Sequence, residues 1–209
     1  MIRFLTASFL IPFPSFLKVF FFRYFLGWKI GRNVKIGFSF ISAKNVDIGD
    51  GVYIGHFNQI RLCRNLSVGN KVTIMNNNQI TGSSQNSESW TNEIIIEESC
   101  YITSHHFFDI SGGIIIGNDS VIGGRDTHIW SHTIKMIKGR RELVPKKCII
   151  GRKSYLGARV TLVCNTIPSR SLVGAGAVIA KEFQESQAHE GQMIAGNPCK
   201  ILKKYTILE

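Results

Sequence analysis

The sequence lacks the cysteine spacing of a disulfide-stabilised or zinc-bound domain. Its 209 residues contain five cysteines, an odd number without any Cys-x-x-Cys pair: Cys63, Cys100, Cys148, Cys164 and Cys199. Scattered single cysteines are typical of reduced thiols, whereas disulfide frameworks and structural zinc sites use paired cysteines at short spacing. The pattern therefore favours a cytosolic protein over a disulfide scaffold.

Acidic residues are also scarce. The chain has 14 Asp and Glu against 25 Lys and Arg, which gives a net charge of +11, and only 19% of its residues are charged. Because 44% of the residues are hydrophobic, wholesale disorder and a coiled coil are both disfavoured, and the length fits one domain with a short appendage. The basic excess favours an anionic membrane or an anionic small molecule as partner. Nucleic acid is not expected, since no recognisable reading module accompanies the charge.

An uninterrupted run of about 20 apolar residues, as a membrane-spanning helix needs, is missing. The closest approach is the segment 1–28, which holds eight of the fourteen phenylalanines but is broken by Pro12 and Pro14. A signal peptide is not predicted either, because no small-residue cleavage site follows. This segment is therefore expected to be a helical appendage.

Residues 15–26 predict one short helix in that appendage, with Ser15 as its N-cap and Gly27 as its stop. Apolar residues surround the helix, so most of its surface must be buried. One hypothesis is peripheral contact with a membrane, with Lys18 and Arg23 reaching anionic headgroups. The other is a helix that caps the domain or packs at a subunit interface.

A six-residue repeat dominates the rest of the chain. An aliphatic residue followed by glycine recurs at Ile30-Gly31, Ile36-Gly37, Ile48-Gly49, Ile54-Gly55, Val68-Gly69, Ile116-Gly117, Ile122-Gly123, Ile150-Gly151, Leu156-Gly157 and Val173-Gly174. Neither a helix nor an ordinary strand has this period. One short strand and one turn per repeat close a triangular coil every three repeats, and stacked coils bury the aliphatic ladder. The sequence therefore predicts an all-β fold, a parallel β-helix.

The repeat also predicts where the chain leaves the coil. Its phase breaks at residues 82–93, a polar stretch, and at residues 135–147, which carry Lys135, Lys138, Arg140, Arg141, Lys146 and Lys147 against Glu142 alone. Both stretches are expected to be loops, and long loops on a rigid solenoid are commonly functional. A solvated basic loop is the alternative for the second.

Three segments resemble the left-handed β-helix, hexapeptide-repeat acyltransferases: residues 149–158, 172–179 and 195–200. Residues 112–132 resemble the branch of that family associated with cell-surface polysaccharide acetylation. The resemblance implies a left-handed β-helix over residues 29–182, after the helical segment 1–28 and before a C-terminal segment and helix at 183–209. It also implies a homotrimer that binds acetyl-CoA along a groove between neighbouring coils, with no metal.

Histidine is the natural candidate for the base of acetyl transfer to a hydroxyl, which also needs a donor for the oxyanion. By the resemblance, His132 matches the family's catalytic histidine, although relatives often have glycine where Thr133 follows. His106 is the second candidate, as base or as a sugar-binding residue. His128 falls in the inward phase of the repeat, which favours a core or interface histidine.

The other three histidines are weaker candidates: His56, His105 and His189. His105 is expected to point away from its neighbour, because adjacent strand residues face opposite sides, and the other two are expected at the surface.

The resemblance also assigns the donor side. Gly157 and Ala158 would lie at the thioester, with the backbone N–H of Ala158 donating to the oxyanion. Ala175 would lie along the pantetheine arm, and Lys181 and Lys203 would face the phosphates of coenzyme A. Lysine suits solvated phosphates as a mobile point charge, although a solvated surface role fits either lysine.

For the acceptor side, Asn77 and Asp109 offer polar groups for sugar hydroxyls, and Trp130 offers an apolar face for a pyranose ring. Alternatively, asparagine rows can stack at β-helix corners and a tryptophan can pack between subunits. Either Asp109 or Asp126 is a candidate to orient a catalytic histidine.

Together these features favour an O-acetyltransferase that moves an acetyl group from acetyl-CoA directly to a sugar hydroxyl. The expected context is biosynthesis of a surface polysaccharide, such as an O-antigen, capsule or exopolysaccharide, in the cytoplasm or at the inner face of its membrane. Three alternatives stay open: an N-acetyltransferase acting on an amino sugar, a zinc carbonic anhydrase of the same fold class, and a non-catalytic binding protein.

Overall fold

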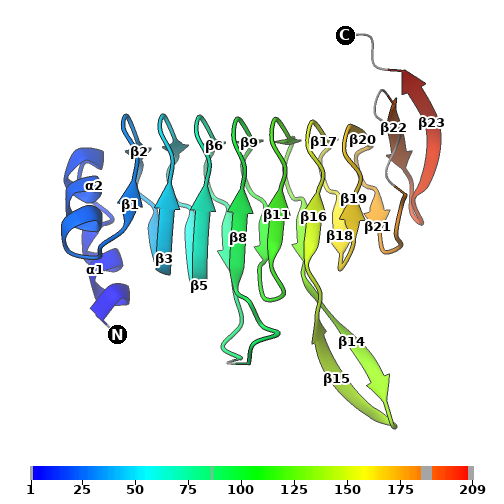
Figure 1. The fold of residues 1–209 in the computed structure, drawn as a ribbon, viewed down its shortest axis with the longest axis horizontal. Helices are drawn as coiled ribbons and strands as arrows, with labels where there is room; N and C mark the ends of the chain where they lie inside the picture. Colours follow the sequence, from blue (N-terminus) through cyan, green and yellow to red (C-terminus); the bar gives the residue numbers. More distant parts are fainter. Residues whose placement is uncertain (1, 86, 185–189, 207–209) are drawn as a thin grey trace.

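The chain forms the predicted left-handed parallel β-helix. A computed structural model describes residues 2–85, 87–184 and 190–206. The coils stack along the long axis of the molecule, with two helices at the N-terminal end and a strand pair at the C-terminal end (Figure 1). Three faces enclose one core, so the fold is a three-sided prism.

Each face is a ladder of parallel strands. The first contains β1 (Lys29–Ile30), the second halves of β3 (Phe40–Ile48) and β5 (Gln59–Val68), β8 (Glu93–Ile96), β11 (Ile114–Ile116), β16 (Cys148–Ile150) and β19 (Thr166–Ile167). The second contains β2 (Lys35–Ile36), β4 (Tyr53–Ile54), β6 (Thr73–Ile74), β9 (Tyr101–Ile102), β12 (Val121–Ile122), β17 (Tyr155–Leu156), β20 (Ser171–Val173) and β22 (Glu190–Ala195). The third contains the first halves of β3 and β5, then β7 (Gln79–Thr81), β10 (Phe107–Asp109), β13 (His128–Trp130), β18 (Thr161–Val163) and β21 (Val178–Ile179).

The core is the aliphatic ladder that the repeat predicts. One side chain per strand points inward, and on the second face these are the fully buried Ile54, Ile74, Ile102, Ile122 and Leu156. Each rung covers the apolar surface of the next, so removal of that surface from water stabilises the whole stack rather than any single coil.

The repeat phase shifts at one corner, and the inward placement of His128 was therefore wrong. Ile102 and Phe108 are both buried and six positions apart, whereas the buried pair one coil later, Ile122 and Ile129, is seven positions apart. The corner at residues 123–127 contains one additional residue. As a result Ile129 points inward and His128 lies exposed on the third face.

Two helices, α1 (Ile2–Leu10) and α2 (Ser15–Tyr24), cover the N-terminal end of the β-helix (Figure 1). The predicted helix at residues 15–26 corresponds to α2. Phe22 and Trp28 are buried against the first coil, with ring centroids 4.4 Å apart. Neither helix is long and apolar enough to cross a bilayer, within the part of the chain that the structure describes.

Two details of α2 differ from the prediction. Ser15 does not cap the helix, because Pro14 occupies the N-cap position. The Ser15 hydroxyl instead accepts a hydrogen bond of 2.8 Å from the N–H of Ile36. Lys18 does not reach out to lipid, because its side chain is buried and its ammonium donates to the carbonyl of Gly37. Burial lowers the pKa of Lys18.

The two predicted excursions leave the coil, but in different forms. The segment between β7 and β8 has no strand among its described residues and is a loop. The second excursion is an ordered arm of two antiparallel strands, β14 (His132–Ile137) and β15 (Arg140–Pro145), which projects away from the β-helix (Figure 1). Its turn, Lys138-Gly139, has φ values of 48° and 76°, as a two-residue hairpin turn requires.

The described C-terminal residues form strands, so the helix expected within 183–209 was wrong for this part of the chain. Strand β23 (Lys200–Thr206) pairs antiparallel with β22. Strand β22 is the last strand of the second face, and its outer edge would otherwise expose unpaired backbone groups. The C-terminal strand covers that edge.

Candidate active site

His132 and Asp109 meet at the edge of the third face. His132 is the first residue of the arm and directly follows Ser131 and β13, whereas Asp109 ends β10 beside Trp130. Nδ1 of His132 lies 2.7 Å from Oδ2 of Asp109, and the two side chains are 27% and 8% exposed. Of the two aspartates considered from the sequence, Asp109 is thus the one in contact with His132.

The geometry of this contact is specific. Nδ1 of His132 is buried and makes no aligned hydrogen bond among the described residues, so the carboxylate oxygen lies off the N–H axis despite the short distance. The other oxygen of Asp109 accepts a hydrogen bond of 2.8 Å from the N–H of Ser111. One carboxylate oxygen of Asp109 is thus held by the backbone, and the other faces the imidazole.

The backbone before His132 is fixed to the neighbouring coil. The hydroxyl of Ser131 donates to the carbonyl of Asp109 at 2.6 Å and accepts from the N–H of Gly112 at 2.8 Å. A Cβ at Gly112 would lie 2.1 Å from the carbonyl oxygen of Ser131, so this close approach requires glycine. The position of His132 is therefore set by rigid coils and not by the exposed arm.

Two tryptophans flank the imidazole. The ring centroid of His132 lies 5.9 Å from that of Trp90 and 6.4 Å from that of Trp130. Phe107 extends this cluster, with its centroid 4.9 Å from that of Trp130. Trp90 was not among the residues expected at the site, although it is the one aromatic residue of the polar segment 82–93 and could have been recognised by that position.

A pocket of about 360 Å³ lies on the third face beside this cluster. It is lined by Asn77, Gln79, His105, His106, Phe107, Asp126, His128 and Trp130. Two of the three predicted acceptor residues, Asn77 and Trp130, therefore meet in one pocket. The third, Asp109, contacts His132 instead.

At one corner of the prism, between the second and third faces, the side chains change from large to small along the axis. In the first coils it carries large side chains, such as Phe38 and His56. Farther along it carries Gly124, Ala158 and Ala175, and the backbones approach so closely that a Cβ at Gly124 would lie 2.5 Å from that of Ala158. We refer to these three residues and Gly157, at the same corner, as the strip of small residues.

Comparisons with known proteins bear on this arrangement. No protein-family model matches the chain, and no curated protein matches its sequence. Among solved structures, the chain resembles the polysialic acid O-acetyltransferase OatWY at 25% sequence identity and a TM-score of 0.50, over 87% of this chain and 90% of that one. It also shares its fold with AntD, an N-acyltransferase from Bacillus cereus in complex with dTDP-4-amino-4,6-dideoxyglucose and coenzyme A, at a TM-score of 0.62 and 16% identity, over 92% and 88% of the two chains.

The chain therefore has the fold of the hexapeptide-repeat acyltransferases and resembles one of them, OatWY, in sequence as well. Its donor-side residues can be placed on this hexapeptide-repeat scaffold. Gly157, Ala158 and Ala175 lie on the strip of small residues, where a Cβ at Gly157 would lie 2.9 Å from the backbone nitrogen of Ala175. Lys181 follows β21 and Lys203 lies in β23, both exposed at the C-terminal end of the prism.

His106 lies inside this hexapeptide-repeat domain rather than at its surface. Although it borders the pocket, it is 1% exposed, and both ring nitrogens have partners. Nδ1 accepts from the N–H of Thr127 at 3.1 Å, and Nε2 lies 2.8 Å from the hydroxyl of Thr103. Burial lowers its pKa to about 4. His106 continues a buried column in which Asn58 and Asn78 occupy the equivalent position in preceding coils.

The remaining histidines differ in their surroundings. His105 is exposed with a φ of 64°, and Nδ1 of His56 accepts from the N–H of Phe38 at 3.2 Å. His189 lies outside the described residues. No group of three or more His, Cys, Asp or Glu that could hold a metal occurs within residues 2–85, 87–184 and 190–206.

One copy of the chain does not bring His132 and Ala158 together. His132 follows the end of β13 that pairs with Val163, whereas Ala158 precedes Thr161 at the opposite end of β18. The two residues therefore lie toward opposite edges of the same face.

Proposed function

We propose that the protein is an O-acetyltransferase that moves an acetyl group from acetyl-CoA to a sugar hydroxyl in surface-polysaccharide biosynthesis. The observation that carries this proposal is the contact of 2.7 Å between His132 and Asp109, next to a pocket with aromatic and polar walls. Apolar surface combined with a few polar groups is typical of sites for small polar ligands such as sugars.

His132 acts as the general base. Asp109 lies at Nδ1 of His132, which leaves Nε2 to accept the proton of the sugar hydroxyl while the hydroxyl oxygen attacks the thioester carbonyl. The thiolate of coenzyme A then leaves and takes up the proton from the imidazolium. Asp109 positions the ring and stabilises its cationic form. This route is a direct transfer that needs neither a metal nor an acetylated enzyme.

His106 is the weaker candidate for this role. A base must meet the substrate, and both ring nitrogens of His106 already have partners in the interior. Because burial lowers its pKa to about 4, it would also be a poor proton acceptor at neutral pH. We assign it to the stability of the corner.

The oxyanion donor would come from a second copy of the chain. The separation of His132 and Ala158 along one face supports a homotrimer in which the backbone N–H of Ala158 from a neighbouring copy faces His132. The strip of small residues at Gly157, Ala158 and Ala175 suits an extended pantetheine arm. Lys181 and Lys203 would contact the phosphates.

The resemblance to OatWY supports an O-linked acceptor in a polysaccharide, since that protein is a polysialic acid O-acetyltransferase. Polysialic acid is therefore the first polymer to test. The five described cysteines are free and buried, which suits a reducing cytoplasm. Residues 1–28 would hold the enzyme at the inner face of the cytoplasmic membrane.

The experiment that tests this function is calorimetric titration of the purified protein with acetyl-CoA, followed by an acceptor screen. Micromolar binding and transfer to a hydroxyl acceptor support the proposal. Paired acceptors, one with hydroxyls only and one with a free amine, separate O-acetylation from N-acetylation. Absence of acetyl-CoA binding would contradict the proposal altogether.

A further inference from the structure

The N-terminal end of the molecule exposes aromatic side chains that the β-helix core does not take up. Phe16 and Tyr24 are 71% and 73% exposed, and Phe9, Phe20 and Phe25 are at least half exposed. We refer to these five residues as the N-terminal aromatic surface. Exposed apolar groups gathered in one region usually mark an interaction site.

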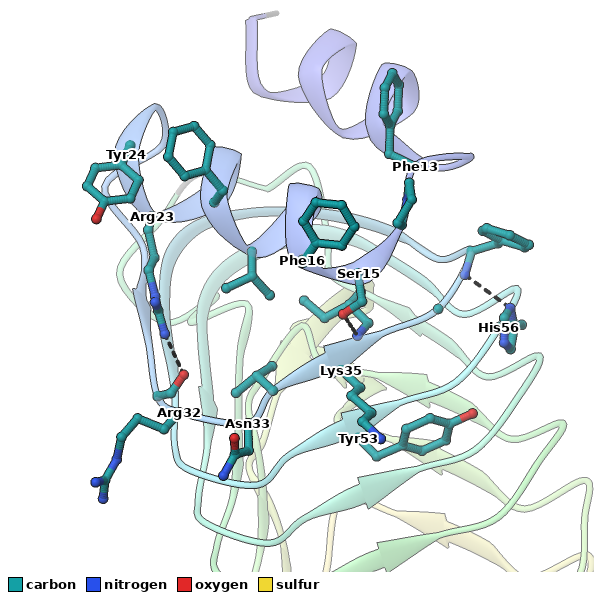
Figure 2. Close-up of a pocket in the computed structure, with 18 residues that line it drawn as sticks. Phe13, Ser15, Phe16, Arg23, Tyr24, Arg32, Asn33, Lys35, Tyr53 and His56 are labelled. Atoms are coloured by element: carbon teal, nitrogen blue, oxygen red, sulfur yellow. Dashed lines mark hydrogen bonds between the residues drawn. The ribbon is translucent and has the colours of Figure 1, made fainter.

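A groove runs beside this surface. Phe16, Phe20 and Tyr24 follow one another at four-residue spacing along α2 and line one side of a pocket of about 990 Å³. Lys35 and Tyr53, from the first coils, line the other side (Figure 2). The groove therefore combines an aromatic wall with a partly cationic one.

The charge of this end is one-sided. Residues 1–46 contain no Asp or Glu but include Arg3, Lys18, Arg23, Lys29, Arg32, Lys35 and Lys44. Some of these cations have internal roles, since Lys18 donates to Gly37 and Arg23 donates to the carbonyl of Ile30. Lys29 and Lys35 are exposed and have no side-chain partner among the described residues.

We propose that the N-terminal aromatic surface docks on a bilayer of anionic phospholipids. Exposed rings insert at the headgroup boundary, while Lys29 and Lys35 contact lipid phosphates, a combination typical of interfacial helices. The acidic residues nearest to this end are accompanied by cations, since Asp47 lies beside Lys29 in the paired strand and Asp50 forms an ion pair of 2.8 Å with Arg32, so their repulsion of such lipids is reduced. The inference deepens the proposed function, because it names the lipid chemistry and the part of the chain that contacts it.

Docking at this end determines how far His132 lies from the bilayer surface. The third face passes from β3 through β5, β7 and β10 to β13, directly before His132. Four steps of about 4.8 Å place His132 about 20 Å beyond the first coil. The helices lie at one end of the stack of coils (Figure 1). With the axis of the stack along the bilayer normal, the acceptor sugar would lie well above the headgroups. A glycan carried on a membrane lipid meets this requirement.

Vesicle sedimentation tests the proposal. The full-length protein should sediment with vesicles of phosphatidylcholine mixed with phosphatidylglycerol, more weakly with phosphatidylcholine alone, and less as salt is raised. The double variants F16S/F20S and K29E/K35E should each lower binding by about tenfold or more. The matched controls are Y101S/Y155S and K153E, which change exposed tyrosines of the second face and an exposed lysine elsewhere; they should bind like the unchanged protein.

Three outcomes would overturn the proposal. In the first, the unchanged protein fails to sediment with anionic vesicles. In the second, every variant sediments with them to the same extent as the unchanged protein. In the third, F16S/F20S changes the mass measured by light scattering, which would make the surface a contact between copies of the chain. Acetyl-CoA titration of the same variants shows that they are folded. Because vesicle binding and acetyl-CoA binding are measured separately, failure of one does not decide the other.

Discussion

Nδ1 of His132 lies 2.7 Å from Oδ2 of Asp109, although the two residues belong to different strands and are brought together only by the stacking of coils. Asp109 is nearly buried and is held by the N–H of Ser111. This contact places the carboxylate beside the imidazole before any substrate binds. The reactivity of the site then depends on the carboxylate as well as on the base.

Replacement of Asp109 by Asn should lower kcat by about 10²–10⁴ while leaving acetyl-CoA binding unchanged. An amide keeps the shape and the contact with Ser111 but cannot stabilise the imidazolium. Steady-state kinetics with titration of the same variant would check this. The control is D126N, a pocket carboxylate not in contact with His132, and equal losses in both variants would contradict the positioning role of Asp109.

Trp130 is expected to bind the acceptor, because it lines the pocket beside His132. Trp130→Ala should raise the KM for the sugar by roughly tenfold with a smaller change in kcat, because the apolar wall of the pocket is lost. Trp130→Phe retains an aromatic ring and should remain close to the unchanged enzyme. Initial rates over a range of acceptor concentrations distinguish these cases. A large fall in kcat at unchanged KM would show that Trp130 does not act through acceptor binding.

The strip of small residues should be sensitive to bulk. Ala175 is exposed, so Ala175→Leu should fold normally but weaken acetyl-CoA binding by about tenfold or more, a loss of roughly 1.4 kcal/mol. Arg152→Leu, at an exposed position on another corner, is the control. Calorimetric titration measures both variants. Unchanged affinity in Ala175→Leu would mean that the donor lies elsewhere.

His106 should make the fold sensitive to acid. Burial lowers its pKa from 6.5 to about 4, so the folded state resists protonation that the unfolded chain accepts. The free energy of unfolding should therefore decrease as the pH falls from about 6.5 toward 4, by up to about 3 kcal/mol from this residue. Urea unfolding at pH 7 and pH 5 measures it.

The matched variant for that measurement is His106→Asn, because Asn58 and Asn78 occupy the equivalent positions of the column. It should lose most of this pH dependence while keeping acetyltransferase activity within a few-fold. An equally steep pH dependence in the variant would assign the effect to other groups.

The repeat made most of the fold predictable, because every coil needs the same inward aliphatic residue. His128 was misplaced for a local reason: one additional corner residue shifts the phase, and a fixed period cannot register it. The arm was predicted as a loop that leaves the coil but not as a hairpin. Its many basic residues favoured a solvated loop, and the turn at Lys138-Gly139 was not recognised. The C-terminal strands depend on an open sheet edge that only the assembled fold provides.

The site was predictable in its parts but not in its contacts. His132, Asp109, Asn77 and Trp130 were all candidates from the sequence, yet two coils must stack before Asp109 meets His132. The same stacking encloses His106, which the sequence alone could not distinguish from an exposed base. Trp90 lies in the loop between β7 and β8, and the six-residue repeat does not determine the conformation of this loop.

The most direct test of the account is acetyl transfer from acetyl-CoA to a hydroxyl acceptor by the unchanged protein and by His132→Ala. A general base contributes about 10²–10⁴ to turnover, so the variant should lose activity by that factor while still binding acetyl-CoA. His56→Ala, at a half-exposed histidine of the first coils outside the acceptor pocket, should retain activity within a few-fold. Full activity in His132→Ala would contradict the assignment of the base and the mechanism built on it.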